Sequence, residues 1–346
     1  MNDRQSWLDQ VAEDILEPDR PIVDPHHHFW KRGPFGTYLL EDLWADTGSG
    51  HRVQKTVFVE CHAEYRDGPP EAMRPLGETE FVARLASRSA ADRTAAARVR
   101  GIVGHADLRL GAGVEEVLQA HLDAGQGLFR GIRQHASWDA SDDVPNSRLD
   151  PPPHLYSESD FREGFARLAP LGLSFDVWNY HPQIPELTGL ARAFPETTIV
   201  LNHLGGPLGI GPYADRRDEV FSSWERDLTV LGKCPNVVAK LGGIAMAING
   251  FGWHERERPP TSDELAAAQR PYLLHAIECF SPGRCMFESN FPVEKLSVSY
   301  SILWNAFKKV AAPLVEEEKD ALFRGTAERV YRLDAGVGAT VPHTLR

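Results

Sequence analysis

The chain has 346 residues, of which 42% are hydrophobic and 25% are charged, a composition that excludes disordered, collagen-like and coiled-coil chains. Its 37 basic and 49 acidic residues give a formal net charge of −12, so it lacks the positive charge that attracts nucleic acid or an anionic membrane surface. It also contains no run of about 18 apolar residues that could span a membrane. We therefore expect no nucleic-acid partner and no membrane partner.

The N-terminal residues and the cysteines predict a cytoplasmic protein. Residues 1–20 contain six acidic residues and no apolar stretch of the kind found in a secretory signal. The four cysteines include no Cys-x-x-Cys pair, and so few cysteines in a chain of this length indicate reduced thiols. We expect residues 1–20 to form a surface arm, which is a possible contact in a homo-oligomer, and residues 335–346 to form a C-terminal tail.

Between these ends, residues 21–334 alternate short apolar runs with longer amphipathic ones. The predicted strands are 21–28, 55–64, 99–108, 127–135, 173–180, 197–203, 236–242 and 284–290. The predicted helices are 78–97, 114–124, 161–171, 300–310 and 315–331. Strands that are apolar throughout are typical of parallel sheets buried on both faces. We therefore expect one α/β domain folded as a (β/α)8 TIM barrel, of the metal-dependent-hydrolase kind.

An open doubly wound sheet is the alternative fold, but the Gly-x-Gly-x-x-Gly motif of dinucleotide-binding sheets does not follow the first strand. Two long insertions, 136–158 and 247–262, follow the fourth and seventh strands. Long loops without regular structure are usually functional, and both are expected at the C-terminal mouth of the barrel, where enzymes of this fold keep their active sites.

The strongest chemical signal lies at the end of the first predicted strand. Side chains alternate along a strand, so His26 and His28 share one face and His27 points the other way. Two imidazoles that point into a barrel mouth supply half of a metal site. These two histidines are therefore predicted as catalytic residues and metal ligands.

Five motifs in order along the chain resemble one known group of proteins. They are Ile22-Val23-Asp24-x-His26-x-His28-Phe29-Trp30, Gly131-Ile132-Arg133, residues 200–207 (VLNHLGGP), residues 237–243 (VVAKLGG) and residues 287–293 (FESNFPV). They are similar to the amidohydrolase superfamily, and more narrowly to its TIM-barrel group of L-fuconolactonase-like and 2-pyrone-4,6-dicarboxylate-lactonase-like hydrolases. The resemblance implies a hydrolase that opens a lactone with an activated water, and it adds His203 to the predicted catalytic and metal-binding residues.

One departure from the group's pattern bears on the chemistry. The group's strand-eight Asp, which binds metal or acts as base, is replaced by Asn290, and an amide can orient or polarise but cannot accept a proton at neutral pH. Glu288, two residues earlier on the same face, is the carboxylate that we expect to serve as base or metal ligand. The alternative is a structural ion pair between Glu288 and Lys240 on the neighbouring strand.

Further residues at strand ends are predicted to bind the substrate. Arg133 offers a guanidinium fork to a carboxylate or a lactone oxygen, and His181 directly follows the fifth predicted strand. Trp30 and Trp178 are expected to line an apolar pocket, and Lys240 completes this set. The group's members that clamp a dicarboxylated ring carry an Arg where this chain has Gly206, so we expect a less anionic substrate.

These observations leave the cofactor and the reaction open between stated alternatives. His26, His28 and His203 would hold either a divalent metal, with Zn²⁺ favoured, or the carbonyl oxygen of the substrate directly. The favoured activity is hydrolysis of a cyclic small-molecule ester. The alternatives are a metal-dependent non-oxidative decarboxylase of the same superfamily, and a barrel that has lost its base and only binds a ligand.

Overall fold

The computed structural model, which describes residues 2–92, 97–146 and 150–334, contains an eight-stranded parallel sheet in the order β1-β4-β5-β6-β7-β8-β9-β10. Its strands are β1 (Pro21–His27), β4 (Arg52–Val59), β5 (Arg98–Gly104), β6 (Phe129–His135), β7 (Ser174–Trp178), β8 (Ile199–Leu201), β9 (Val237–Leu241) and β10 (Cys285–Phe287). All eight overlap the predicted strands in order, so the predicted TIM barrel is confirmed.

The first and last strands meet through backbone bonds just beyond β10. His28 N donates to Phe291 O at 2.8 Å, and Asn290 N donates to His26 O at 2.9 Å. His27 and Phe291 form an isolated parallel bridge. The seam of the barrel is therefore made by the residues that flank the predicted site.

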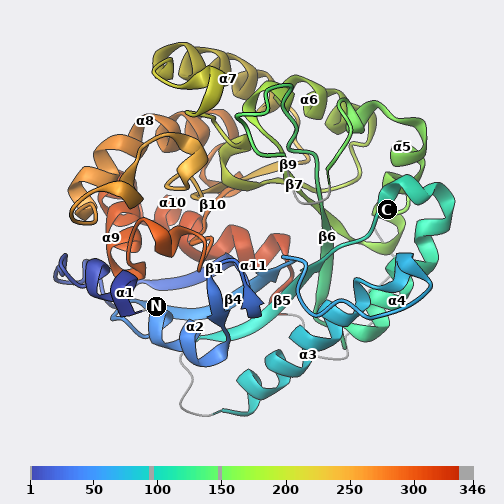
Figure 1. Ribbon diagram of the computed structural model, residues 1–346, viewed down its shortest axis with the longest axis horizontal. Helices are drawn as coiled ribbons and strands as arrows, with labels where there is room; N and C mark the ends of the chain where they lie inside the picture. Colours follow the sequence, from blue (N-terminus) through green and yellow to red (C-terminus); the bar gives the residue numbers. More distant parts are fainter. Residues whose placement is uncertain (1, 93–96, 147–149, 335–346) are drawn as a thin grey trace.

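The helices surround this ring of strands, as the view down the barrel shows (Figure 1). They are α1 (Asn2–Leu8), α2 (Leu40–Thr47), α3 (Leu76–Ala91), α4 (Val114–Ala124), α5 (Ser159–Phe165), α6 (Ile184–Ala193), α7 (Arg217–Leu231), α8 (Ser262–Phe280), α9 (Tyr300–Ala311), α10 (Glu316–Asp320) and α11 (Thr326–Val330). A π-helical turn, Ala321–Gly325, joins α10 to α11. Helices α2, α6, α7 and α8 lie outside the predicted helical ranges. No described helix is long and apolar enough to cross a membrane.

The large apolar core lies between the sheet and the surrounding helices. Within it, Phe29 and Phe58 stack with ring centroids 5.8 Å apart, and the His27 ring packs 4.7 Å from Phe29. His27 therefore faces outward from the barrel, as the strand alternation predicts. A smaller apolar cluster that includes Val23, Val200 and Met286 fills the inside of the ring below the site.

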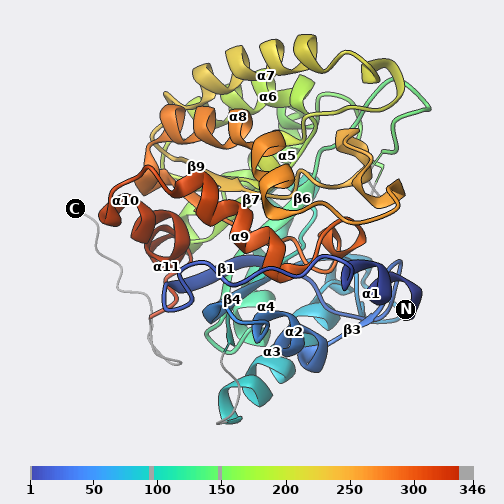
Figure 2. The same cartoon turned by 90° about the vertical axis from the view of Figure 1, so that its left-hand side faces the viewer.

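The N-terminal segment contacts the barrel through polar bonds. Trp7 Nε1 donates to Arg256 O at 2.9 Å, and Ser262 N donates to Glu13 Oε1 at 2.8 Å. Figure 2 shows α1 beside the small hairpin of β2 (Trp30–Gly33) and β3 (Gly36–Tyr38). The predicted tail 335–346 and the last residues of the helix predicted over 78–97 lie outside the described residues. The four cysteines are free thiols.

Several strands end earlier than predicted because the backbone turns out of the sheet. His203, Leu204 and Asn290 have positive φ values of 53°, 55° and 55°. The left-handed conformation is uncommon for residues other than glycine, and it occurs often at functional sites. The predicted strands 197–203 and 284–290 therefore shorten to β8 and β10, and His203 and Asn290 are turned toward the barrel axis.

Candidate active site

The side chains of His26, His203 and Glu288 converge at the mouth end of the barrel. One nitrogen or oxygen atom from each lies within 4.8 Å of the others, and the rings of His26 and His203 have centroids 4.6 Å apart. Glu288 is fully buried and links the two rings, because His203 Nδ1 lies 2.7 Å from Oε1 and His26 Nδ1 lies 2.7 Å from Oε2. The structure thus brings together two histidines from distant parts of the chain on one carboxylate.

A glycine allows this approach. Gly243 has a φ of 65°, and a Cβ atom there would lie 1.9 Å from His203 Nδ1. No side chain fits at this distance, so the His203–Glu288 contact requires glycine at position 243. The nearby Gly206 has a φ of 57°, and its Cβ would lie 2.7 Å from Asn179 O. The backbone of this chain therefore disfavours any side chain at position 206, where the group members that clamp a dicarboxylated ring carry an Arg.

Charges of both signs surround His26. Lys240 Nζ lies 3.3 Å from His26 Nδ1, and Arg133 Nη1 lies 3.3 Å from Nε2. Burial and the charge of Lys240 lower the pKa of His26 well below its usual value, so the ring is neutral at pH 7. Burial alone would raise the pKa of Glu288, but the neighbouring His203 and Lys240 hold it below its usual value. Glu288 is therefore an anion that is hydrogen-bonded to His203 and in contact with His26.

The alternative interpretation, an ion pair between Lys240 and Glu288, is wrong. Lys240 Nζ binds Asp176 Oδ2 at 2.8 Å, and Tyr331 donates to the same oxygen at 2.8 Å. Asp176 lies on β7 and Lys240 on β9, two strands apart in the sheet. Residues of alternate strands share a layer inside a TIM barrel, so these side chains meet below the site.

His28 lies beside the Glu288 cluster and has different partners. Its Nδ1 lies 2.8 Å from the carbonyl oxygen of Val59, to which it must donate. Burial and the charge of Arg133 lower the pKa of His28 well below its usual value, so Nε2 carries no proton. Nε2 lies 3.2 Å from the Asn290 amide, which complements it when the NH₂ group is turned toward the ring. Asn290 can thus donate to His28, which an ionised Asp could not do.

A cavity of about 200 Å³ opens above these residues, and most of the predicted site borders it. His28, Trp30, Arg133, Trp178, His203 and Asn290 line this cleft. His26 and Glu288 are each 0% exposed and lie beneath it. Trp178 packs edge-on against His203 with ring centroids 4.8 Å apart. The predicted aromatic wall is therefore present beside the histidines.

Two predicted substrate contacts do not reach this cleft, and those expectations are corrected. Lys240 is 0% exposed because it lies below His26 and is bound to Asp176. His181 is buried against Tyr213, at 5.1 Å between ring centroids, and it accepts from Leu208 N at 3.4 Å. A side chain that directly follows a strand can pack under the next loop instead of facing the barrel axis.

The structure also brings Glu60 and His135, which were not among the predicted site residues, into the cleft. Arg133 Nε and His135 Nε2 each lie 2.7 Å from Glu60 Oε1. Burial alone would raise the pKa of Glu60, but the charge of Arg133 and the interaction with His135 hold it well below its usual value. Both residues stand at strand ends, on the loop side of β4 and at the last position of β6. This position could have identified His135, which ends the predicted strand 127–135, but not Glu60, which lies inside the predicted strand 55–64.

His135 has one nitrogen without a protein partner. Because Glu60 is ionised and only accepts, Nε2 of His135 must be the protonated nitrogen. Burial lowers the pKa of His135, although Glu60 acts in the opposite direction, so the ring is neutral at pH 7. Nδ1 is then an acceptor, and it is buried without a hydrogen-bond partner among the described residues. A neutral imidazole with a free acceptor nitrogen and a carboxylate behind it is the arrangement of a general base.

Comparisons with known proteins match nearly the whole chain. A family model described as "Amidohydrolase" matches residues 23–333. An uncharacterized protein, y4mH, of Sinorhizobium fredii is 33% identical over 91% of this chain and 99% of its own. An L-fucono-1,5-lactonase of Burkholderia multivorans is 26% identical over 90% of this chain and 96% of its own.

A solved structure of an amidohydrolase from Burkholderia multivorans with bound zinc has 25% sequence identity to this chain. Its TM-score is 0.69, and the match covers 90% of this chain and 99% of that one. The matches therefore include every strand of the barrel and each residue of the site described above.

Proposed function

Because this chain belongs to the amidohydrolase family, we propose that it hydrolyses a cyclic ester, a lactone, in the cleft at the mouth of its barrel. The observation that carries the proposal is the convergence of His26, His203 and Glu288 within 4.8 Å beneath a cleft that also contains Arg133 and the His135–Glu60 pair. The lactonase activity named for the 26% identical relative supports the same substrate class.

His135 serves as the general base in this proposal. Its Nδ1 accepts a proton from the attacking water, and Glu60 stabilises the resulting imidazolium through the 2.7 Å bond to Nε2. Glu60 also holds the ring in the tautomer that leaves Nδ1 free. This pair supplies the proton acceptor that the amide of Asn290 cannot provide.

Arg133 stabilises the negative charge that develops on the carbonyl oxygen. Its Nε and Nη2 are bound to the Glu60 side chain and the Glu60 carbonyl. Nη1 lies 3.3 Å from His26 Nε2 and has a second N–H group to offer to the carbonyl oxygen. A guanidinium fixed in place by a buried carboxylate needs no reorganisation as the charge appears. Trp30 and Trp178 border the same space with apolar surface that excludes water.

The residues present fit a divalent metal ion. Two imidazoles and a carboxylate form a donor set that zinc prefers. Glu288 Oε2, which lies 2.7 Å from His26 Nδ1, is buried and accepts no hydrogen bond of suitable geometry among the described residues. The charges inside the barrel also allow a bound cation. Three carboxylates (Glu60, Asp176 and Glu288) face two cations (Arg133 and Lys240), which leaves one net negative charge. His26, His203 and Glu288 would hold the ion, which would polarise the carbonyl and acidify water.

The test is a panel of five- and six-membered lactones assayed for acid release with and without a chelator. We expect turnover by the wild type, and a loss of about 10²-fold or more in kcat/KM for His135→Asn. His154→Asn changes an exposed histidine outside the cleft and should leave the rate unchanged. Release of CO₂ from carboxylated phenols without any lactone turnover would replace this proposal with the decarboxylase alternative. Absence of both would contradict catalysis at this site.

A further inference from the structure

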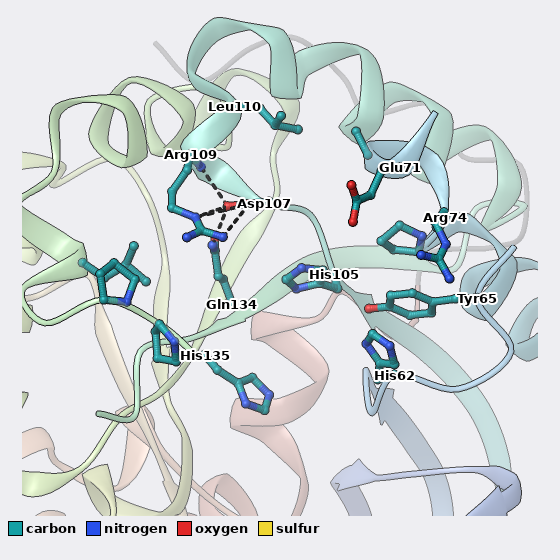
Figure 3. Close-up of a pocket in the computed structure, with 15 residues that line it drawn as sticks. His62, Tyr65, Glu71, Arg74, His105, Asp107, Arg109, Leu110, Gln134 and His135 are labelled. Carbon is teal, nitrogen blue, oxygen red and sulfur yellow. Dashed lines mark hydrogen bonds and ion pairs between the residues drawn. The ribbon is translucent and has the colours of Figure 1, made fainter. Parts of the chain in front are cut away.

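A second cavity of about 330 Å³ lies beside the catalytic cleft and is larger than the cleft itself. His62 and His135 line both spaces, so a ligand bound over His135 can extend from one into the other. Figure 3 shows the second cavity with Tyr65, His105 and Gln134 around it. The proposed lactone hydrolysis occupies only the cleft, and the adjoining space has no role in it.

The polar atoms that this second cavity offers are mostly acceptors or hydroxyls. His105 Nδ1 lies 3.0 Å from the carbonyl oxygen of Arg133 and must donate to it, so in the neutral ring Nε2 is an acceptor. The Tyr65 hydroxyl is buried without a hydrogen-bond partner among the described residues. Gln134 is held in place by two bonds, since it donates to Asp107 at 2.8 Å and accepts from Leu108 N at 2.9 Å. The available groups therefore complement a ligand that carries a hydrogen-bond donor.

The charges around the second cavity balance. Glu71 and Asp107 face Arg74 and Arg109, and Arg109 is bound to Asp107 at 2.8 Å. The four side-chain charges sum to zero, and this balance favours a neutral ligand. An acceptor-only group such as a carboxylate is further disfavoured by the lone pair on His105 Nε2.

The rest of the wall is apolar. Leu155, Pro151 and Pro152 border the cavity together with Leu110. Leu110 is 42% exposed and is one of only two large hydrophobic side chains exposed in the described part of the chain. A ligand with an apolar body lying in this cavity would cover Leu110 and remove it from water.

We propose that the second cavity is a specificity pocket that binds a neutral, hydroxyl-bearing substituent of the substrate, with Tyr65 and His105 reading the hydroxyl group. The inference rests on the proposed lactone hydrolysis for the placement of the ester in the cleft. It adds that the substrate is larger than a single ring and carries a hydrogen-bond donor on an apolar or aromatic substituent next to the reacting group.

The experiment compares two δ-lactones that carry a phenyl substituent with either a para-hydroxyl or a para-methoxy group. The methoxy compound keeps the acceptor oxygen and loses the donor, and its methyl group makes it slightly larger. We expect the wild type to prefer the hydroxyl compound about tenfold in kcat/KM, the effect of one hydrogen bond. Tyr65→Phe should reduce this preference to less than about threefold, and Ala72→Phe, which fills the cavity, should lower kcat/KM for both compounds. Tyr272→Phe, a control on α8 outside both cavities, should change neither the hydroxyl preference nor kcat/KM.

Binding of the corresponding lactams, measured by calorimetry, separates this inference from the proposed function. If no lactone is turned over but the hydroxyl lactam binds more tightly and Tyr65→Phe removes that difference, the reaction is wrong and the pocket is right. If lactones are turned over without a hydroxyl preference, or with a preference that Tyr65→Phe leaves intact, the pocket assignment is overturned. The same holds if neither turnover nor lactam binding distinguishes the two substituents.

Discussion

Replacing Glu60 with Gln removes one buried negative charge and keeps the shape of the side chain. In the wild type, Glu60 Oε1 accepts from Arg133 Nε and His135 Nε2, both at 2.7 Å. Hydrogen bonds to charged groups contribute about 1.5–3 kcal/mol and neutral ones about 0.5–1.5 kcal/mol. Two bonds that lose their charge-assisted character should therefore lower the free energy of unfolding by roughly 2 kcal/mol. Glu60→Ala, which leaves the Arg133 guanidinium buried and unpaired, should cost about 3–5 kcal/mol.

The same substitution separates a structural role from a catalytic one. Because Glu60 raises the pKa of His135 against the effect of burial, Glu60→Gln should move the acidic limb of the pH–kcat/KM profile to lower pH. It should also reduce kcat by about 10²-fold, since the imidazolium loses its counter-ion.

Urea unfolding at pH 7 and a pH–rate profile measure the two effects. Glu41→Gln, which breaks an exposed ion pair with Arg88, is the matched control and should change the free energy of unfolding by less than about 1 kcal/mol. Wild-type stability together with an unmoved acidic limb in Glu60→Gln would refute both the ionised state of Glu60 and the role given to His135.

Three further predictions concern the metal, the pH dependence of stability and the backbone. His203→Ala should abolish binding of one equivalent of zinc, whereas His28→Ala should retain it because His28 is bonded to Val59 and Asn290. Metal analysis after dialysis measures the bound zinc. An equal loss of zinc in both variants would instead support His26, His28 and His203 as the metal ligands. Burial raises the pKa of Glu294 to about 8, so the folded protein holds this proton while the unfolded chain releases it near its ordinary value. Stability from this group is therefore lost as pH rises toward 8, by up to about 1.4 kcal/mol per pH unit. Urea unfolding of Glu294→Gln at pH 5 and pH 8 should show a weaker decline than the wild type, and an unchanged decline would show that Glu294 is ionised. Gly243→Ala places a methyl group 1.9 Å from His203 Nδ1 and should lower both kcat/KM and the thermal midpoint. In the control Gly189→Ala, the added Cβ meets no atom within 4 Å, so neither kcat/KM nor the thermal midpoint should fall. Similar behaviour of the two variants would contradict the packing argument.

The barrel and its strand-end histidines could be predicted because they depend on local pattern. Apolar runs of strand length mark the sheet, and polar residues at their ends mark the mouth, which is how His26 and His28 were found, whereas His203 was added by the family resemblance. The same rule includes His135 at the end of the fourth predicted strand. It does not include Glu60, which lies inside the predicted strand 55–64 and is at a strand end only because β4 ends at Val59. Helices α2, α6, α7 and α8 were missed although α6 and α7 bury apolar residues at helical spacing, Ile184, Leu187 and Leu190 in the first and Val220, Trp224, Leu228 and Leu231 in the second.

Partner choice inside the barrel could not be predicted from the sequence. Lys240 binds Asp176, two strands away, and not the carboxylate on the neighbouring strand, because the layer that a side chain enters depends on strand tilt and register. The left-handed backbone at His203 and Asn290 is likewise a tertiary effect, since neither residue signals it in the sequence. These are the features that decide which carboxylate serves which histidine.

The seam between β1 and the end of β10 has a consequence for how the protein acquires activity during synthesis. The bonds that close it, from His28 N to Phe291 O and from Asn290 N to His26 O, join the beginning of the chain to a segment made near its end. Glu288, which links His26 to His203, emerges from the ribosome with that same late segment. His26 and His203 are therefore synthesised well before the segment that brings them together. A product truncated before residue 288 would have neither the closed barrel nor the Glu288 carboxylate. The catalytic centre is therefore completed only once residues 288–291 have been synthesised.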